Sequence, residues 1–87
     1  MLFKTLDLKD TIADMLSEDY RERFRAEYKQ VVIRLSKLKA IITKYHNYEL
    51  DFNINCPISV LERQLYIMEQ YEAILRERAS HEGINLD

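Results

Sequence analysis

The residues with the clearest capacity for chemistry are two tyrosines and two arginines on neighbouring turns of one predicted helix. They are Tyr20, Arg21, Arg25 and Tyr28. Guanidinium groups bind phosphate through paired hydrogen bonds, and tyrosine rings stack on nucleobases. The sequence therefore predicts a ligand-binding site for a nucleotide-type anion. A second interpretation stays open, because tyrosines at this spacing also fill the edges of a helical core.

Other reactive residues do not form a recognisable catalytic or metal-binding arrangement. The chain has no Ser/His/Asp set in a strand-turn-helix context and no glycine-rich phosphate loop. Cys56 is the single cysteine, and His46 and His81 lie far apart, which disfavours a disulfide and a metal cluster. We therefore expect no enzyme activity, no catalytic residue, no metal and no cofactor.

The element that must position the site is one long helix over about residues 18–46. An apolar residue recurs at spacings of three and four, which is the period of an amphipathic helix. Ser17-Glu18-Asp19 offers a cap and an acidic first turn. We call the recurring apolar positions the seam: Phe24, Tyr28, Val31, Leu35, Leu38, Ile42 and Tyr45.

Two further helices are predicted around this one. Asp7 caps a short helix over about residues 8–16, with its inward face at Leu8, Ile12, Met15 and Leu16. After a packed loop at 47–56, a long helix spans about 57–82. Its start has two possible frames, with Pro57 at the first helical position or with Ser59 and Glu62 as a capping box. Gly83 is expected to end it in a left-handed turn that folds Ile84 back toward Ala79.

The whole chain, residues 1–87, is thus predicted to be a single all-α domain. Its one glycine and one proline leave little material for a β-sheet. The seam should pack antiparallel against a stripe of the last helix formed by Leu61, Leu65, Met68, Leu75 and Ala79, because a short loop returns the chain beside itself. The expected architecture is an antiparallel helical hairpin with a short N-terminal helix.

More apolar surface is present than one hairpin can bury, which predicts a homo-oligomer. Small and apolar residues stand opposite the seam, and the last helix has a second apolar stripe. The alternative is that the alanines are simply good helix formers and Ile33 an isolated exposed residue. The predicted oligomer interface is Ala26, Ile33, Ala40, Ile67, Tyr71 and Ile74.

Charge is distributed unevenly along the chain. Residues 20–45 hold eight Lys or Arg and two Glu, a net +6, between acidic flanks of −3 at 1–19 and −5 at 46–87. The basic face either binds an anion or pairs with acids of the last helix, such as Glu62, Glu69, Glu72 and Glu77. A net charge of −2 disfavours duplex nucleic acid as a partner.

The start of the chain is too polar for a signal peptide, since Asp7 follows a few apolar residues, and no stretch is apolar enough to span a membrane. We therefore expect a cytoplasmic protein with no membrane partner.

Three segments resemble a family of small helical accessory proteins encoded by bacteriophages, related to a crAss-like phage gene product of unknown activity. The segments are residues 19–28 (DYRERFRAEY), 56–59 (CPIS) and 82–86 (EGINL), and the similarity spans roughly residues 12–86. The resemblance implies a phage protein acting in the bacterial host cytoplasm. Short phage accessory proteins often counter host immunity. An anti-defence role is therefore expected by analogy with such proteins, and no residue of this chain indicates it directly.

Two functions remain open at this point. In the first, a homo-oligomer sequesters a nucleotide-type immune signal in pockets between subunits without cleaving it. In the second, the protein is a helical interaction module that inhibits or scaffolds a host or phage protein, such as a host defence protein. The first requires a pocket with converging cations, and the second an exposed apolar surface.

Overall fold

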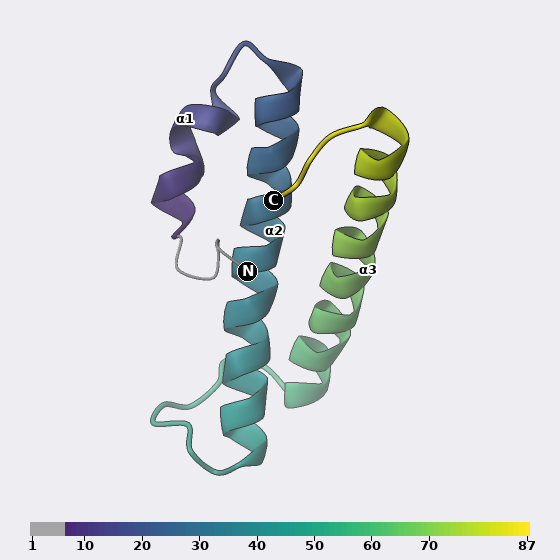
Figure 1. The fold of residues 1–87 in the computed structure, drawn as a ribbon. Coiled ribbons are helices and arrows are strands. Elements are labelled where there is room, and N and C mark those ends of the chain that lie inside the picture. The colour runs from purple at the N-terminus through teal and green to yellow at the C-terminus, as the bar shows by residue number, and fades with distance from the viewer. Residues whose placement is uncertain (1–6) are drawn as a thin grey trace.

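The computed structural model describes residues 7–87 and consists of two long helices packed side by side, with a short helical segment before them (Figure 1). In order, the chain forms the 3₁₀ helix η2 (Leu8–Thr11), the one-turn helix α1 (Ile12–Met15), α2 (Tyr20–His46) and α3 (Ile58–Glu82). No strand occurs among the described residues. The predicted all-α class is therefore confirmed, and the helices begin and end within two residues of the expected positions.

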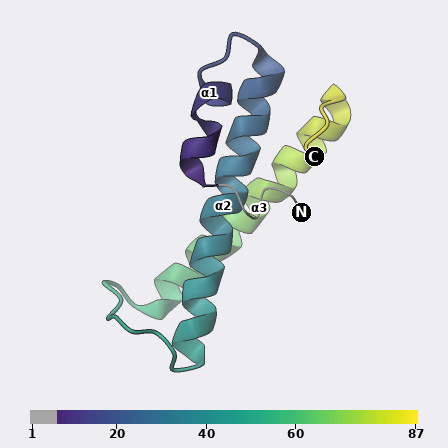
Figure 2. The same ribbon diagram turned by 60° about the vertical axis from the view of Figure 1, so that its left-hand side comes forward.

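Contacts near both ends of the hairpin show that α2 and α3 are antiparallel, as predicted. The Tyr20 hydroxyl donates to Glu82 Oε1 at 2.8 Å near the open end, and His46 Nε2 lies 3.3 Å from Glu62 Oε2 near the loop. The rotated view shows that α3 crosses α2 obliquely (Figure 2). The two helices therefore pack closely over only part of their length.

The hydrophobic core lies toward the open end of the hairpin. It is formed by the first half of the seam, by two residues of α3, and by the segment after α3 that folds back onto α2 (Figure 1). The second half of the seam is less covered, since Ile42 is buried but Leu35 and Leu38 are half-buried and Tyr45 is exposed. The core cluster is Phe24, Tyr28, Val31, Val32, Leu75, Ala79 and Ile84, with Leu35 and Leu86 packed against it.

The predicted end of α3 is confirmed in detail. Gly83 adopts a left-handed conformation with φ 68°, and its N–H donates to the Ala79 carbonyl. The Ile84 N–H reaches the same carbonyl at 2.9 Å, which is the bond that defines a Schellman motif. Ile84 is then 7% exposed. This turn directs residues 84–87 back across α2.

The predicted inward face of the first helix is wrong, although Asp7 does cap it. Thr11 is the buried residue of this segment and Leu8 is half-buried, while the other three predicted residues, Ile12, Met15 and Leu16, are exposed. The first four residues form a 3₁₀ helix with three residues per turn, so side chains rotate differently from those of an α-helix. A face chosen from the α-helical period therefore does not point at α2.

The face of α2 opposite the seam is covered by this N-terminal segment rather than by another subunit. Gln30 on that face donates to Thr11 Oγ1 at 2.9 Å, and Lys37 Nζ pairs with Asp7 at 3.1 Å. Ala26 and Ile33 are accordingly 1% and 5% exposed within one chain. Their assignment to an oligomer interface is corrected, because they are already buried within one chain.

The start of α3, after the loop that connects it to α2, also differs from the prediction. Pro57 is the N-cap residue and the helix begins at Ile58, so neither predicted frame is correct. No side chain caps this end. Leu50 and Ile54 are half-buried, whereas Phe52 is 54% exposed. The loop therefore places an aromatic ring at the surface.

Among residues 7–87, no helix is long and apolar enough to cross a lipid bilayer. The segment 1–6, on which the expectation about a signal peptide depends, lies outside the described residues.

Candidate functional site

Three cations follow one edge of α2 at intervals of four residues: Arg21, Arg25 and Lys29. We call them the cation row. Arg25 and Lys29 are half-buried and Arg21 is exposed. Within residues 7–87, no carboxylate lies within ion-pair distance of any of the three. Like charges at this spacing repel one another, so a bound anion would relieve the repulsion.

A hollow of about 250 Å³ opens beside the row and is lined by Arg25, Lys29, Asn85, Leu86 and Asp87. Its far wall is the C-terminal segment, which returns from α3 to α2 (Figure 1). Asp87 adds a carboxylate to this wall and lowers the positive potential there. Ligand pockets for drug-sized molecules usually exceed about 300 Å³. The hollow of one chain therefore suits a phosphate group rather than a whole dinucleotide.

The cations and the wall are held in place by features that the sequence specifies locally. Asp19 caps α2 by accepting the Arg21 N–H at 2.9 Å, which fixes the first turn. On the opposite wall, Ile84 is buried and the Asp87 N–H donates to Asn85 Oδ1 at 3.0 Å. The Gly83 turn thus forms the wall as well as ending the helix. Lys29 was absent from the predicted set, although its position four residues after Arg25 places it on the same edge of the helix and could have indicated it.

Tyr20 is engaged with α3. Its hydroxyl donates to Glu82 and accepts from Arg78 Nη2 at 2.9 Å, while its ring lies edge-on to Phe24 with centroids 6.1 Å apart. The hydrogen bond to Glu82 raises the pKa of Tyr20 above its ordinary value. The ring is still 45% exposed. Tyr20 therefore links the two helices while nearly half of its surface stays accessible.

Tyr28 does not belong to the ligand site, and this assignment is corrected. Its side chain is 2% exposed in the core, and its hydroxyl donates to Glu72 Oε1 at 3.1 Å. Burial, followed by that hydrogen bond, raises the pKa of Tyr28 to about 12. The Arg76 guanidinium lies over the ring at 5.7 Å from its centroid. The ring has no face open to a ligand, because the core and Arg76 cover it.

The α3 part of the predicted oligomer interface is exposed in the single chain. Ile67 and Ile74 are 64% and 48% exposed. Tyr71 is 41% exposed, and its hydroxyl donates to Glu27 of α2. Ala40 is exposed on α2. Of the six predicted residues, four therefore remain accessible to a partner, and three of these lie on α3.

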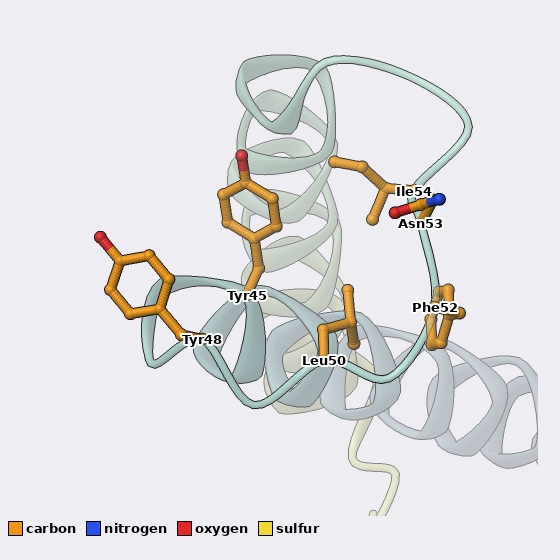
Figure 3. Close-up of a pocket in the computed structure, with 6 residues that line it drawn as sticks. All are labelled: Tyr45, Tyr48, Leu50, Phe52, Asn53 and Ile54. Carbon is orange, nitrogen blue, oxygen red and sulfur yellow. The ribbon is translucent and has the colours of Figure 1, made fainter.

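A second group of accessible side chains lies at the loop end of the hairpin and was not predicted. Three aromatic residues gather there, with Tyr48 97% exposed. They line a hollow of about 550 Å³ together with Leu50, Asn53 and Ile54. Figure 3 shows Leu50 and Ile54 between Tyr45 and Phe52, with Tyr48 beyond Tyr45 and its hydroxyl directed outward. We call this group the hairpin-end aromatic site: Tyr45, Tyr48, Leu50, Phe52, Asn53 and Ile54.

Comparison with known proteins identifies a family for most of the chain. The protein-family model Sequestin matches residues 18–81, which include α2, the loop and nearly all of α3. No curated protein and no solved structure matches the chain. The family name is consistent with a sequestering role. On the extent of this match, the chain belongs to the Sequestin family.

Proposed function

We propose that this protein sequesters a nucleotide-type immune signal in pockets of a homo-oligomer, without catalysing a reaction. The observation that carries the proposal is the half-buried pair Arg25 and Lys29, which faces a hollow and has no carboxylate partner within ion-pair distance among residues 7–87. The family name supports a sequestering role. The resemblance to phage accessory proteins supports an anti-defence role in the bacterial cytoplasm.

The size of the hollow supports a site that two subunits complete. Phosphate groups would bind Arg25 and Lys29 through charge-assisted hydrogen bonds. A hollow of about 250 Å³ leaves no room in one chain for the rest of a nucleotide. A second subunit docked beside it would supply the missing walls. The exposed surface of α3 provides the apolar contact that such an assembly needs.

The proposal predicts that calorimetry of the full chain against cyclic dinucleotides and ADP-ribose-type nucleotides gives saturable heat for at least one compound. Replacing both Arg25 and Lys29 with Ala should weaken that binding at least about tenfold, since two charge-assisted contacts are lost. Asp87→Asn should strengthen it by removing a repulsive carboxylate. The compound should be recovered unchanged after the protein is denatured.

Arg34→Ala is the matched control. Arg34 is exposed on α2 and lies about half a turn round the helix from Arg25, since nine residues at roughly 100° each place it on the opposite side. Its loss should leave binding unchanged. The proposal fails if no nucleotide in the panel gives heat, or if the Arg25 and Lys29 double variant binds as tightly as the wild type.

A second candidate function is a helical interaction module that docks on a host or phage protein. The observation favouring it is the exposed apolar surface of α3 at Ile67 and Ile74. The two functions can be distinguished by comparing the wild type with an Ile67→Glu and Ile74→Glu double variant, each used as bait to capture protein partners. If the variant loses a stoichiometric protein partner and the wild type binds no nucleotide, the interaction module is the better account.

A further inference from the structure

Tyr48 holds an unfavourable backbone conformation at the end of α2. Its φ is 57°, in the left-handed region, and it is the one non-glycine residue with positive φ among those described. The surrounding turn is a Schellman motif, in which the Glu49 N–H donates to the Lys44 carbonyl at 2.8 Å and the Tyr48 N–H to the Tyr45 carbonyl at 3.2 Å. This position normally holds glycine, as Gly83 does at the end of α3.

The strain at Tyr48 is not offset by burial of its side chain. The ring is 97% exposed, so it contributes almost nothing to the core. Strained residues persist mainly where they serve a function, and an observed outlier is a valid starting point for a functional hypothesis. A glycine would form the same turn at lower cost. The feature that Tyr48 adds over glycine is an aromatic ring at the surface.

That ring stands between two hollows. The larger, of about 550 Å³, is the hairpin-end aromatic site. The smaller, of about 280 Å³, is lined by Tyr45, His46 and Tyr48. Both hollows are lined by Tyr45, in the last turn of α2, and by Tyr48, in the turn that follows it. Their two rings lie apart from each other (Figure 3). A flat ring entering either hollow would contact Tyr45 and Tyr48, and a polar side chain also lines each hollow, Asn53 in the larger and His46 in the smaller.

The residues that line these hollows indicate the kind of ligand. None of them is Lys or Arg, so neither hollow carries a permanent positive charge to pair with a phosphate. Aromatic side chains bind planar rings by stacking, and amide or imidazole groups hydrogen-bond to ring nitrogens and carbonyls. We propose that the loop end of the hairpin is a second binding site, for an uncharged heteroaromatic ring of the nucleobase class, held by Tyr45 and Tyr48.

This site is separate from the cation row. Lys29 and Tyr45 are sixteen positions apart on α2, which corresponds to roughly 24 Å. One chain therefore cannot place the same small nucleotide at both. The inference does not depend on the proposed function, because nucleosides carry no phosphate and test the ring site alone.

The experiment is an NMR titration of the full chain with adenosine and guanosine, following the aromatic resonances. We expect saturable shifts at Tyr45, Tyr48 and Phe52. Tyr48→Gly should weaken nucleoside binding by about fivefold or more, the effect of one lost stacking contact. The same substitution should raise the Tm by roughly 4 °C or more, because it removes the left-handed strain. Tyr48→Phe should keep the affinity.

Tyr66→Ala is the control for losing an exposed ring, since Tyr66 is 64% exposed on α3. It should leave nucleoside binding intact. The inference is overturned if nucleosides cause no shifts at the hairpin end, or if Tyr48→Gly binds them like the wild type. It is also overturned if N-acetyltyrosine amide, a mimic of a protein side chain, binds there more tightly than either nucleoside. A Tm that falls in Tyr48→Gly would contradict the strain argument.

Discussion

At the scale of single residues, Tyr28 shows how a predicted ligand contact becomes part of the core. Its ring is buried among the seam residues, and its hydroxyl meets Glu72 at the border between core and solvent. Glu72 also pairs with Arg76, whose guanidinium covers the ring. The buried hydroxyl is thus satisfied while the ring excludes water. Deprotonating it would place a second negative charge beside Glu72.

The raised pKa of Tyr28 predicts a loss of stability at high pH. The hydroxyl keeps its proton in the folded chain up to about pH 12, whereas the unfolded chain releases it near pH 10. The stabilising effect is therefore complete below pH 10 and is lost as the pH rises from 10 toward 12. Urea unfolding across this range should show a steeper decline for the wild type than for Tyr28→Phe. The difference should approach about 1.4 kcal/mol per pH unit. Equal slopes would show that the Tyr28 proton is not linked to folding.

The six tyrosines also show where sequence reasoning stops. Tyr28 and Tyr20 have the spacing of seam and edge positions, and the sequence left open whether they fill the core or bind a ligand. In the structure, Tyr28 donates to Glu72 and Tyr20 donates to Glu82, both on α3. These pairings depend on how α3 crosses α2, which the sequence pattern does not specify. Tyr48 received no prediction, because no local pattern indicates that a tyrosine will adopt a glycine conformation.

At the scale of elements, most ends of helices were predictable, although the start of α3 was not. Asp7 and Gly83 each act as expected, and the cap of α2 falls at the end of the expected Ser17-Glu18-Asp19 segment, at Asp19, because caps depend on a few neighbouring residues. The hairpin of α2 and α3 was also predictable, since the periodicity of the seam is long and regular. The inward face of residues 8–16 was not, because a short segment can begin as a 3₁₀ helix. The false interface at Ala26 and Ile33 follows from that error.

The glycine turn after α3 gives a direct test of these local rules. At Gly83 a Cβ would meet no atom within 4 Å, so any cost of Gly83→Ala comes from the left-handed backbone and not from a clash. We expect Gly83→Ala to destabilise the fold by about 1–2 kcal/mol. Gly83→Asn should cost less, because asparagine tolerates this conformation better. Chemical denaturation measures both. If Ala and Asn cost the same, the backbone explanation is wrong.

At the scale of the whole molecule, the outer surface of α3 has a pattern that is complementary to itself. Arg63, Ile67, Gln70, Ile74 and Glu77 follow one another at spacings of four and three, and all five are exposed. If two copies of α3 pack antiparallel about Gln70, Arg63 of one chain lies opposite Glu77 of the other. Ile67 then lies opposite Ile74. The same contact forms twice, as a two-fold symmetric dimer requires.

Charge reversal on this surface tests the proposed assembly. Within one chain Arg63 and Glu77 are about 21 Å apart along the helix, too far to pair, so any coupling between them must act between chains. Arg63→Glu or Glu77→Arg alone places like charges opposite each other at two points of the dimer. Each should therefore weaken self-association in sedimentation equilibrium while helicity is kept. The double reversal restores opposite charges and should recover the wild-type dissociation constant.

Glu69→Arg, at an exposed position of α3 outside this pattern, should have little effect. A monomeric wild type at micromolar concentration, or a double reversal that stays monomeric, would exclude antiparallel pairing of α3.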